Sequence, residues 1–374
     1  MRVVMFYHSL VSDWNHGNAH FLRGIVTEML SRGIEVAVYE PRDSWSRVNL
    51  VKEHGQAPLR EFKKAYPALG SIQYDAKRFD LDSVLDRADM VIVHEWNDRQ
   101  LIARIGEHHR RFGGYRLYFH DTHHRAATAP KEIATFDLSG YDGVLAYGKV
   151  IRDLYIKNGW TKRAWTWHEA ADIRVFYPRT ISADRPHYDL VWIGNWGDEE
   201  RSDEIREYLI EPVKCLKLKA LVHGVRYPQD ALDELDAAGI EYGGWLPNFD
   251  VPRAFAEAKI TVHIPRRPYV ESLPGIPTIR PFEALACGIP LISKRWDDAE
   301  RLFTAGADFR VVGNGDEMAR EMERLLREET LRQRLSEHGR ATILKRHTCT
   351  HRVGELLAID AELRKTTKQK VMVA

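Results

Sequence analysis

The chain has 374 residues, and this length favours two domains, since a single hydrophobic core rarely serves so long a chain. Apolar residues make up 44% and charged residues 29%, as is typical of a soluble globular protein. The formal net charge of +1 excludes a strong field for nucleic acid or for an acidic membrane face. No run of about 18 apolar residues is present, so no membrane span is expected.

The N-terminus and the cysteines indicate the cellular compartment. MRVVMFYHSL lacks the small-residue cleavage signature of a signal peptide and favours a first strand. Cys215, Cys287 and Cys349 lie far apart and form neither a disulfide framework nor a zinc-binding spacing. A reducing cytoplasm fits this pattern best.

Strand and helix signals alternate through residues 1–178. An apolar strand, RVVMFYHS, precedes a segment over residues 19–33 whose apolar positions recur at helical spacing. Further strands are predicted in IEVAVYE, DMVIVHEW, YRLYFHD, DGVLAYG and RAWTWHEA. Because these runs are apolar on both faces, we expect a parallel sheet covered by helices on both sides, a Rossmann-like domain.

Residues 177–186, YPRTISADRP, interrupt the alternation and are predicted to link two domains. Strands resume in YDLVWIGNW, KALVHGV, ITVHIP, IPLIS and FRVV, so residues 187–345 form a second Rossmann-like domain. A final helix over residues 346–374 is expected to cross back to the first domain. Ligands of open α/β sheets bind beyond the carboxyl ends of the strands, so the loops there should face a central cleft between the two sheets.

The stretch TIRPFEALACGIPLIS, residues 278–293, places a carboxylate at the start of a small apolar helix. Free amides at a helix start attract an anion such as phosphate, and Arg280 beside them can add a bidentate contact. Glu283, one turn in, can accept hydrogen bonds from both hydroxyls of a ribose. The alternative is that Glu283 only complements the helix dipole.

RPFEALACGIPLIS resembles the nucleotide-sugar-binding segment of GT-B glycosyltransferases. With YDLVWIGNW and the tail LLREETLRQRLSEHGRATILKRHT, it is most similar to the CgeB-like (spore maturation protein) branch, related to glycosyltransferase family four. The resemblance covers residues 188–357 well, and GNAHFLRGIVTEMLSRGIEV and VIVHEWND are similar to first-domain segments of the same enzymes. It implies a metal-independent enzyme of GT-B fold that moves a sugar from a nucleoside-diphosphate donor.

The resemblance also implies roles for individual residues. Glu283 is expected to hold the donor ribose. The diphosphate is expected to contact the amides near Thr278 and Ile279 and the side chains of Arg280 and Arg267. Family four carries two glutamates at a fixed spacing, and the position of the first is occupied here by Gly275. Retention or inversion at the anomeric carbon therefore stays open.

YFHDTHHR places histidines and an aspartate just past a predicted strand. GT-B transferases often carry a histidine there, near the donor sugar, and His120 is the closest match. A histidine can donate to a sugar hydroxyl or take its proton, and Asp121 can orient a neighbour or act as the base. His123 is the other catalytic candidate. The alternative is a capped loop with exposed histidines, and the spacing does not fit zinc.

Acceptor-side residues are expected after two strands of the first domain. In HSLVSDWNHGNAHF, Asp13 and His16 are candidate bases, and Gly17 and Asn18 open a helix. The alternative there is a plain strand-to-helix turn capped by Asn18. In VIVHEWND, Glu95 either binds acceptor hydroxyls or is a solvated loop charge.

Two segments of the second domain complete the expected donor site. YGGWLPNFD offers Tyr242, Trp245 and Leu246 as walls for a nucleobase, or as ordinary core residues. IPRRPYV offers two adjacent guanidiniums, Arg266 and Arg267, that suit a diphosphate or form a solvated basic pair.

Two other functions remain open from the sequence: a nucleotide-sugar epimerase of the same fold, and a non-catalytic nucleotide-sugar-binding protein. No cofactor or metal is expected beyond the nucleotide-sugar donor. The donor base and sugar, the acceptor (glycan, small molecule or macromolecule) and the oligomeric state are not specified.

Overall fold

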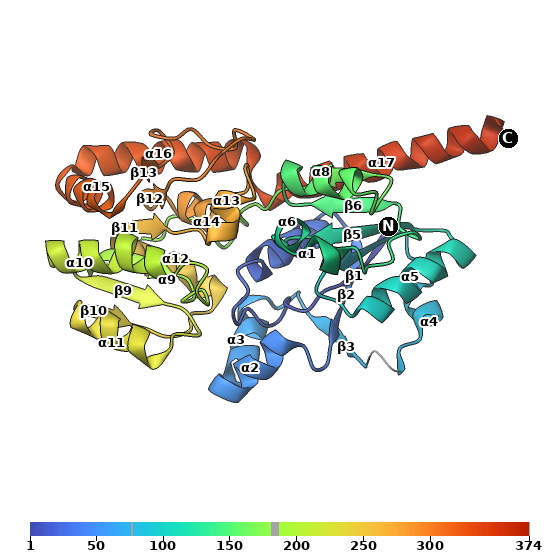
Figure 1. The fold of residues 1–374 in the computed structure, drawn as a ribbon. Coiled ribbons are helices and arrows are strands. Elements are labelled where there is room, and N and C mark those ends of the chain that lie inside the picture. Colours follow the sequence, from blue (N-terminus) through green and yellow to red (C-terminus); the bar gives the residue numbers. More distant parts are fainter. Residues whose placement is uncertain (76–77, 181–186, 374) are drawn as a thin grey trace. The chain divides into compact units, whose positions relative to one another are not determined.

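The computed structural model describes residues 1–75, 78–180 and 187–373, with side chains up to residue 365. Two units make up the chain (Figure 1). The first comprises Met1–Ser12, Leu22–Glu169 and Cys349–Ala374, and the second comprises Asp13–Phe21 and Ala170–Thr348. Within the linker predicted at residues 177–186, residues 181–186 lie outside the described part of the chain.

The first unit holds a seven-stranded parallel sheet with strand order β3-β2-β1-β4-β5-β6-β7. Its strands are β1 (Arg2–Phe6), β2 (Glu35–Pro41), β3 (Ser71–Tyr74), β4 (Met90–His94), β5 (Arg116–Asp121), β6 (Gly143–Ala146) and β7 (Ala164–Thr166). Its helices are α1 (Ala19–Ser31), α2 (Trp45–His54), α3 (Ala57–Ala65), α4 (Leu81–Leu85), α5 (Arg99–Phe112), α6 (Arg125–Thr128), α7 (Pro130–Ile133), α8 (Lys149–Lys157) and α17 (Cys349–Val373). The first turn of α1, up to Phe21, clusters with the second unit.

Apolar strands explain the core of this unit. β4 is buried along its whole length between β1 and β5, as expected for a parallel strand covered on both faces. α5 lies against the loop before β6, where a Cβ added at Gly140 would come 2.1 Å from the carbonyl oxygen of Gly106. Only glycine permits this approach. The last helix, α17, belongs to the same unit, and the backbone oxygen of Arg352 accepts a hydrogen bond from the indole of Trp167 at 2.8 Å.

The second unit holds a six-stranded parallel sheet with strand order β10-β9-β8-β11-β12-β13. Its strands are β8 (Tyr188–Ile193), β9 (Ala220–His223), β10 (Ile240–Tyr242), β11 (Ala258–His263), β12 (Leu291–Lys294) and β13 (Arg310–Val312). Its helices are α9 (Ser202–Ile205), the π-helical turn η2 (Arg206–Ile210), α10 (Glu211–Leu216), α11 (Gln229–Ala237), the 3₁₀ turn η3 (Asn248–Asp250), α12 (Val251–Ala256), α13 (Arg267–Glu271), α14 (Ile279–Cys287), α15 (Gly315–Arg327) and α16 (Glu329–Arg346).

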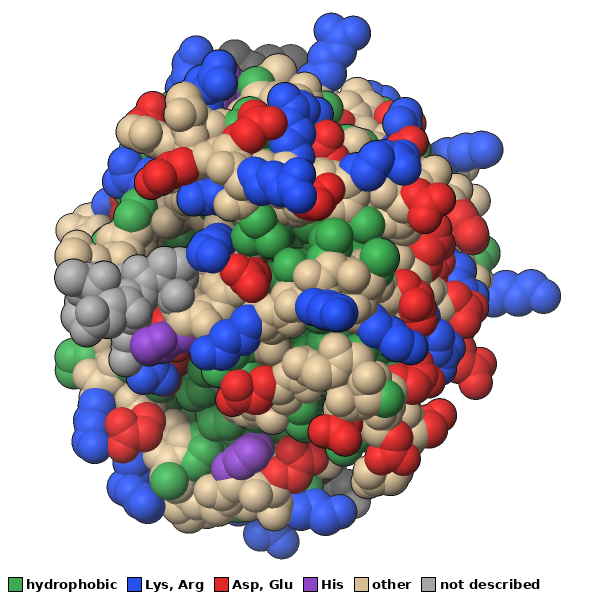
Figure 2. All heavy atoms as spheres, turned by 90° about the vertical axis from the view of Figure 1, so that its left-hand side faces the viewer, with side chains coloured by type: hydrophobic (Ala, Val, Ile, Leu, Met, Phe, Trp, Pro, Cys, Tyr) green, Lys and Arg blue, Asp and Glu red, His purple; other side chains and the backbone are tan. Residues whose placement is uncertain are grey.

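Strand order reverses between β1 and β4 in the first sheet and between β8 and β11 in the second. Ligands of open α/β sheets bind at such switch points, beyond the carboxyl ends of the strands. The α/β class with two parallel sheets is confirmed. Figure 2 shows acidic and basic side chains interspersed over one face, in keeping with the net charge of +1. Among the described residues, no helix is both long and apolar enough to cross a membrane.

Candidate functional site

Helix α14 begins at a strained residue. Thr278, its N-cap, has φ +63° and ψ 176°, a region that residues with a Cβ rarely adopt. All residues of the helix except Arg280 are buried, and Gly288 ends it in the left-handed conformation. Packing therefore fixes the backbone amides at the start of α14, and strain of this kind is often found at binding sites.

Glu283 is completely buried, and side chains engage both of its oxygens. Its Oε1 accepts a hydrogen bond from Nδ1 of His20 at 2.9 Å, and its Oε2 forms an ion pair with Arg280. The other ring nitrogen of His20 accepts the N–H of Asp172 at 2.8 Å, which leaves the proton on Nδ1. Glu283 therefore does more than complement the helix dipole, and it can bind a ribose only if one of its oxygens exchanges its partner.

A cluster of arginines lies beside the start of α14. Nη2 of Arg201 donates to the carbonyl oxygen and to Oδ1 of Asn195, both at 2.6 Å. Arg266 donates to the same Oδ1 at 3.1 Å and to Glu200 at 2.6 Å. Burial, and then the charge of Arg266, lower the pKa of Arg201 to about 9, and the charge of Arg280 acts in the same direction. Three guanidiniums thus share one environment in the second unit.

The arginine cluster has a hydrogen-bond donor and a positive charge that no protein group satisfies within the described residues. No carboxylate pairs with Arg201, and its buried Nε makes no hydrogen bond within the described part of the chain. Buried donors are nearly always bonded in native proteins, so this Nε–H is available to an acceptor oxygen such as that of a phosphate. Burial and the charges of Arg201 and Arg280 also lower the pKa of His263, behind Thr278, to about 3. The local field is positive and suits a polyanion.

The loop after β1 contributes to the second unit. Oδ2 of Asp13 accepts the N–H of Asn248 at 2.9 Å. A Cβ at Gly17 would come 2.9 Å from the side chain of Ile279, so this glycine allows the loop to approach α14. Burial lowers the pKa of His16 to about 4, against the charge of Asp13, and Asn18 is half-buried. Of these predicted acceptor-side residues, Gly17 lies against Ile279 at the start of α14, and Asp13 is held by the backbone of Asn248.

Other residues predicted for the donor lie in different surroundings. The hydroxyl of Tyr242 donates to the carbonyl of Gly224 at 2.8 Å, which ties it to the protein interior. Trp245 and Leu246 are half-buried in the loop after β10. Arg267 turns to α9, where it pairs with Glu204 at 3.0 Å and with Asp203 at 3.1 Å. Its neighbour Arg266 is the one that joins the arginine cluster.

The catalytic candidates lie in the first unit, at the end of β5. His120 is 1% exposed, its Nδ1 lies 2.7 Å from the hydroxyl of Tyr7, and its ring meets that of Trp167 at 4.8 Å. Burial lowers the pKa of His120 to about 3, so the imidazole is neutral near pH 7. The alternative of an exposed histidine is therefore wrong for this residue. A neutral imidazole can donate or accept a proton.

Two buried carboxylates lie beside these histidines. Asp121 accepts the N–H of His123 at 2.9 Å and the hydroxyl of Tyr155 at 2.7 Å. Glu95 is 1% exposed and pairs with Arg125 at 2.7 Å, so it is not a solvated loop charge. Burial raises the pKa of both carboxyls, and the charge of Asp121 raises that of Glu95 further.

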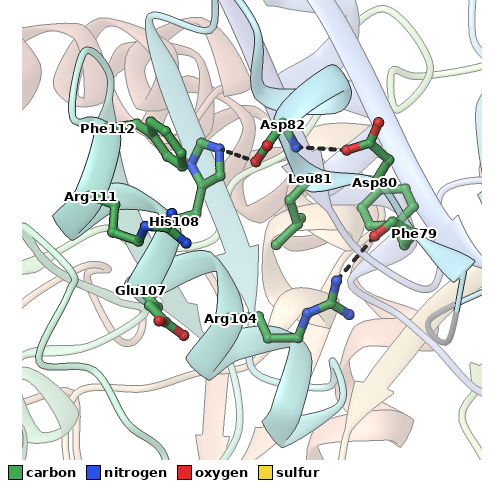
Figure 3. Close-up of a pocket in the computed structure, with 9 residues that line it drawn as sticks. All are labelled: Phe79, Asp80, Leu81, Asp82, Arg104, Glu107, His108, Arg111 and Phe112. Carbon is green, nitrogen blue, oxygen red and sulfur yellow. Dashed lines mark hydrogen bonds and ion pairs between the residues drawn. The ribbon is translucent and has the colours of Figure 1, made fainter.

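A cavity of about 280 Å³ lies elsewhere in the first unit, between α4 and α5 (Figure 3). On its walls, Nε2 of His108 lies 3.3 Å from a carboxylate oxygen of Asp82, and Arg104 donates to the carbonyl of Phe79. None of the predicted site residues lines it. Within the described ranges, no group of three or more His, Cys, Asp or Glu residues is placed to hold a metal ion.

Sequence reasoning missed several partners of the site residues. Arg201 lies shortly after GNW, the loop at the end of β8, and a basic residue following a glycine loop at a strand end is a signal for it. His20 and Glu283 are 263 positions apart, and no local pattern connects them.

The chain resembles known proteins in part of its sequence and in its fold. Residues 201–358 match a family model described as glycosyl transferase-like. No curated protein matches the chain. Solved structures that resemble it include sucrose-phosphate synthase from Thermosynechococcus elongatus (13% identity, TM-score 0.61, 100% of both chains covered). A glycosyltransferase from Rickettsia africae (12% identity, TM-score 0.67) covers 97% of this chain and 98% of its own.

HepE of Anabaena, solved in complex with UDP and glucose, is also similar, with 12% identity and a TM-score of 0.63 over 99% of this chain and 100% of its own. At these identities the likeness shows the fold, and the GT-B architecture expected from the sequence is confirmed. The CgeB-like branch and the relation to family four stay predictions.

Proposed function

We propose that the protein is a glycosyltransferase that transfers a sugar from a nucleoside-diphosphate donor to an acceptor. The observation that carries this proposal is the arginine cluster of Arg201, Arg266 and Arg280 beside the start of α14, with its orphan Nε. Guanidiniums and helix amides are the groups that stabilise a diphosphate, both when bound and as it leaves. The glycosyl transferase-like model, which begins at residue 201, supports the same reading.

The ion pair of Arg280 and Glu283 suggests how the donor is bound. A diphosphate competes with Glu283 for Arg280, because both are anions within reach of one guanidinium. Once Arg280 turns to the diphosphate, Oε2 of Glu283 is released and can accept the ribose hydroxyls. His20 keeps the other oxygen in place throughout. Thr278 and Ile279 supply amides, and Trp245 and Leu246 wall the base.

The chemical step is displacement at the anomeric carbon. The diphosphate leaves on the arginine cluster, which supplies positive charge without a divalent cation. Neutral His120 contacts the donor sugar or the acceptor hydroxyl, and Asp121 and His123 assist it. Glu95 after β4 and Asp13, His16, Gly17 and Asn18 of the loop after β1 serve the acceptor. We place the reaction in the cytoplasm, where the three thiols, none of them in a disulfide, stay reduced.

Two alternative functions differ from transfer in what they do to the donor. An epimerase converts the donor sugar without an acceptor, and a non-catalytic binding protein yields neither hydrolysis nor transfer. The glycosyltransferase-like family model and the similar structures favour transfer over both. Incubation with donor alone, followed by chromatography of the nucleotide and the sugar, separates the three.

Thermal unfolding with a panel of nucleoside diphosphates and their sugars tests the proposal. UDP is the first probe, because HepE was solved with it. A ligand at a hundred times its dissociation constant raises the free energy of unfolding by about 2.7 kcal/mol. We expect at least one nucleotide to stabilise the protein equally with and without EDTA. Absence of a shift with every nucleotide contradicts the proposal.

A further inference from the structure

We propose that Trp96 is the stacking platform of a saccharide subsite in the first unit, and that the acceptor therefore presents a pyranose ring there. This inference rests on the proposed function, since it names the chemical class of the acceptor. It starts from an aromatic residue that the sequence did not single out. Trp96 follows β4, next to Glu95 and close in sequence to the polar residues at the carboxyl end of the sheet.

A guanidinium covers one face of the indole, and much of the residue is exposed. Cζ of Arg125 lies 4.2 Å from the ring centroid, so the guanidinium covers one face. The ring of His123 meets Trp96 edge-on, with centroids 5.2 Å apart at an interplanar angle of 80°. Trp96 nevertheless remains 44% exposed. We assign the exposed area to the face opposite Arg125, because the guanidinium lies over the first face.

The ring is held rigidly. Arg125 donates to Glu95 at 2.7 Å and to Glu132 of α7 at 2.7 Å, so it is fixed from two sides. Glu95 in turn accepts the N–H of Thr122 at 2.9 Å. Burying a carboxylate costs several kcal/mol unless it is paired, and here the pairing immobilises the support of an exposed aromatic ring. A platform fixed before its ligand arrives loses little entropy on binding.

The groups around Trp96 suit both the apolar C–H face and the polar hydroxyls of a sugar ring. The apolar face of the indole suits the C–H face of a pyranose, and polar groups at its edge suit the hydroxyls. The indole N–H of Trp96 makes no hydrogen bond to any described residue, so it is available as a donor. The ring of His8 lies 6.2 Å away on the same edge of the sheet. An apolar plane bordered by hydrogen-bonding groups favours a carbohydrate over a purely apolar partner.

The test uses the full-length protein and simple glycosides. Saturation-transfer NMR measures binding of the methyl glucosides, methyl galactosides, methyl mannosides, cellobiose and maltose. Trp96→Ala and Trp96→Phe are compared with Trp45→Ala, because Trp45 on α2 is 48% exposed and is a matched control. Far-UV circular dichroism and the melting temperature without ligand confirm that each variant is folded.

We expect at least one saccharide to bind the wild type, its affinity to fall tenfold or more in Trp96→Ala, and Phe to restore most of it. Trp45→Ala binds like the wild type. The inference is overturned if no saccharide binds, if Trp96→Ala binds as well as the wild type, or if Trp45→Ala loses as much. A UDP shift without saccharide binding refutes this inference alone, and saccharide binding through Trp96 without a nucleotide shift refutes the donor proposal alone.

Discussion

Replacing Glu283 by Gln separates the two proposed roles of this carboxylate, which pairs with Arg280 and binds the ribose of the donor. The change keeps the size of the side chain and removes the charge that holds Arg280 in a pair whose side chains are 15% and 0% exposed. A hydrogen bond to a charged group contributes about 1.5–3 kcal/mol and a neutral one about 0.5–1.5 kcal/mol, so Arg280 is released by roughly 1–1.5 kcal/mol. Inorganic pyrophosphate, which has no ribose, should then bind about 5–10 times more tightly.

The affinity for UDP should change little, because UDP gains the same release of Arg280 and its ribose loses a charged acceptor of similar strength. The ratio of UDP affinity to pyrophosphate affinity is therefore expected to fall by about 5–10-fold. Isothermal titration of both ligands measures it, and Glu271→Gln, an exposed glutamate on α13, is the control. The reasoning is refuted if both affinities drop together, which is the result of a damaged fold, or if neither changes.

Three further predictions follow from buried groups. Replacing His120 by Ala should lower turnover by about 10²–10⁴-fold, with UDP affinity unchanged in the thermal-shift assay; equal turnover removes it from the mechanism. His263 stays neutral in the folded state down to about pH 3 and takes up a proton below pH 6.5 when unfolded, so stability falls as pH drops through that window. Urea unfolding at pH 7, 6 and 5 should show a slope smaller by about 1 kcal/mol per pH unit in His263→Asn, and an unchanged slope contradicts its buried neutral state. Gly140→Ala should lower the free energy of unfolding by at least about 2 kcal/mol, because the added Cβ would lie 2.1 Å from a backbone oxygen. Gly354→Ala in α17 is the control: it has open space around it and should raise the free energy of unfolding by about 0.5–1 kcal/mol. A Gly140→Ala variant as stable as the wild type would refute the close contact.

The sequence predicted the strands and helices that are marked by a local pattern of apolar residues. β4 and β8 are continuous apolar runs, and the start of α14 combines a proline, a small-residue face and a charged first turn. The short strands β3 and β10 escaped, because SIQY and IEY are partly exposed and carry no apolar run. Periodicity reports burial, and strands at a sheet edge are only half buried.

The sequence could single out a site residue only where a polar side chain follows a predicted strand or begins a predicted helix. His120 and Glu283 could be singled out, but their partners Tyr7 and His20 lie more than a hundred positions away in the sequence. Arg201 could not be singled out from the sequence for the same reason. Its hydrogen bonds to Asn195 and its burial, which lowers its pKa, exist only in the folded chain. Tertiary contacts thus decide which of several candidate charges share one site.

Titration of UDP, GDP, ADP and TDP into the wild type and into an Arg266→Gln/Arg280→Gln double variant measures whether the arginine cluster holds the donor diphosphate. We predict one nucleotide bound per chain and, with two charge-assisted contacts removed at about 1.5–3 kcal/mol each, affinity lower by about 10²–10⁴-fold in the double variant. A double variant that binds the same nucleotide as tightly as the wild type would contradict this prediction.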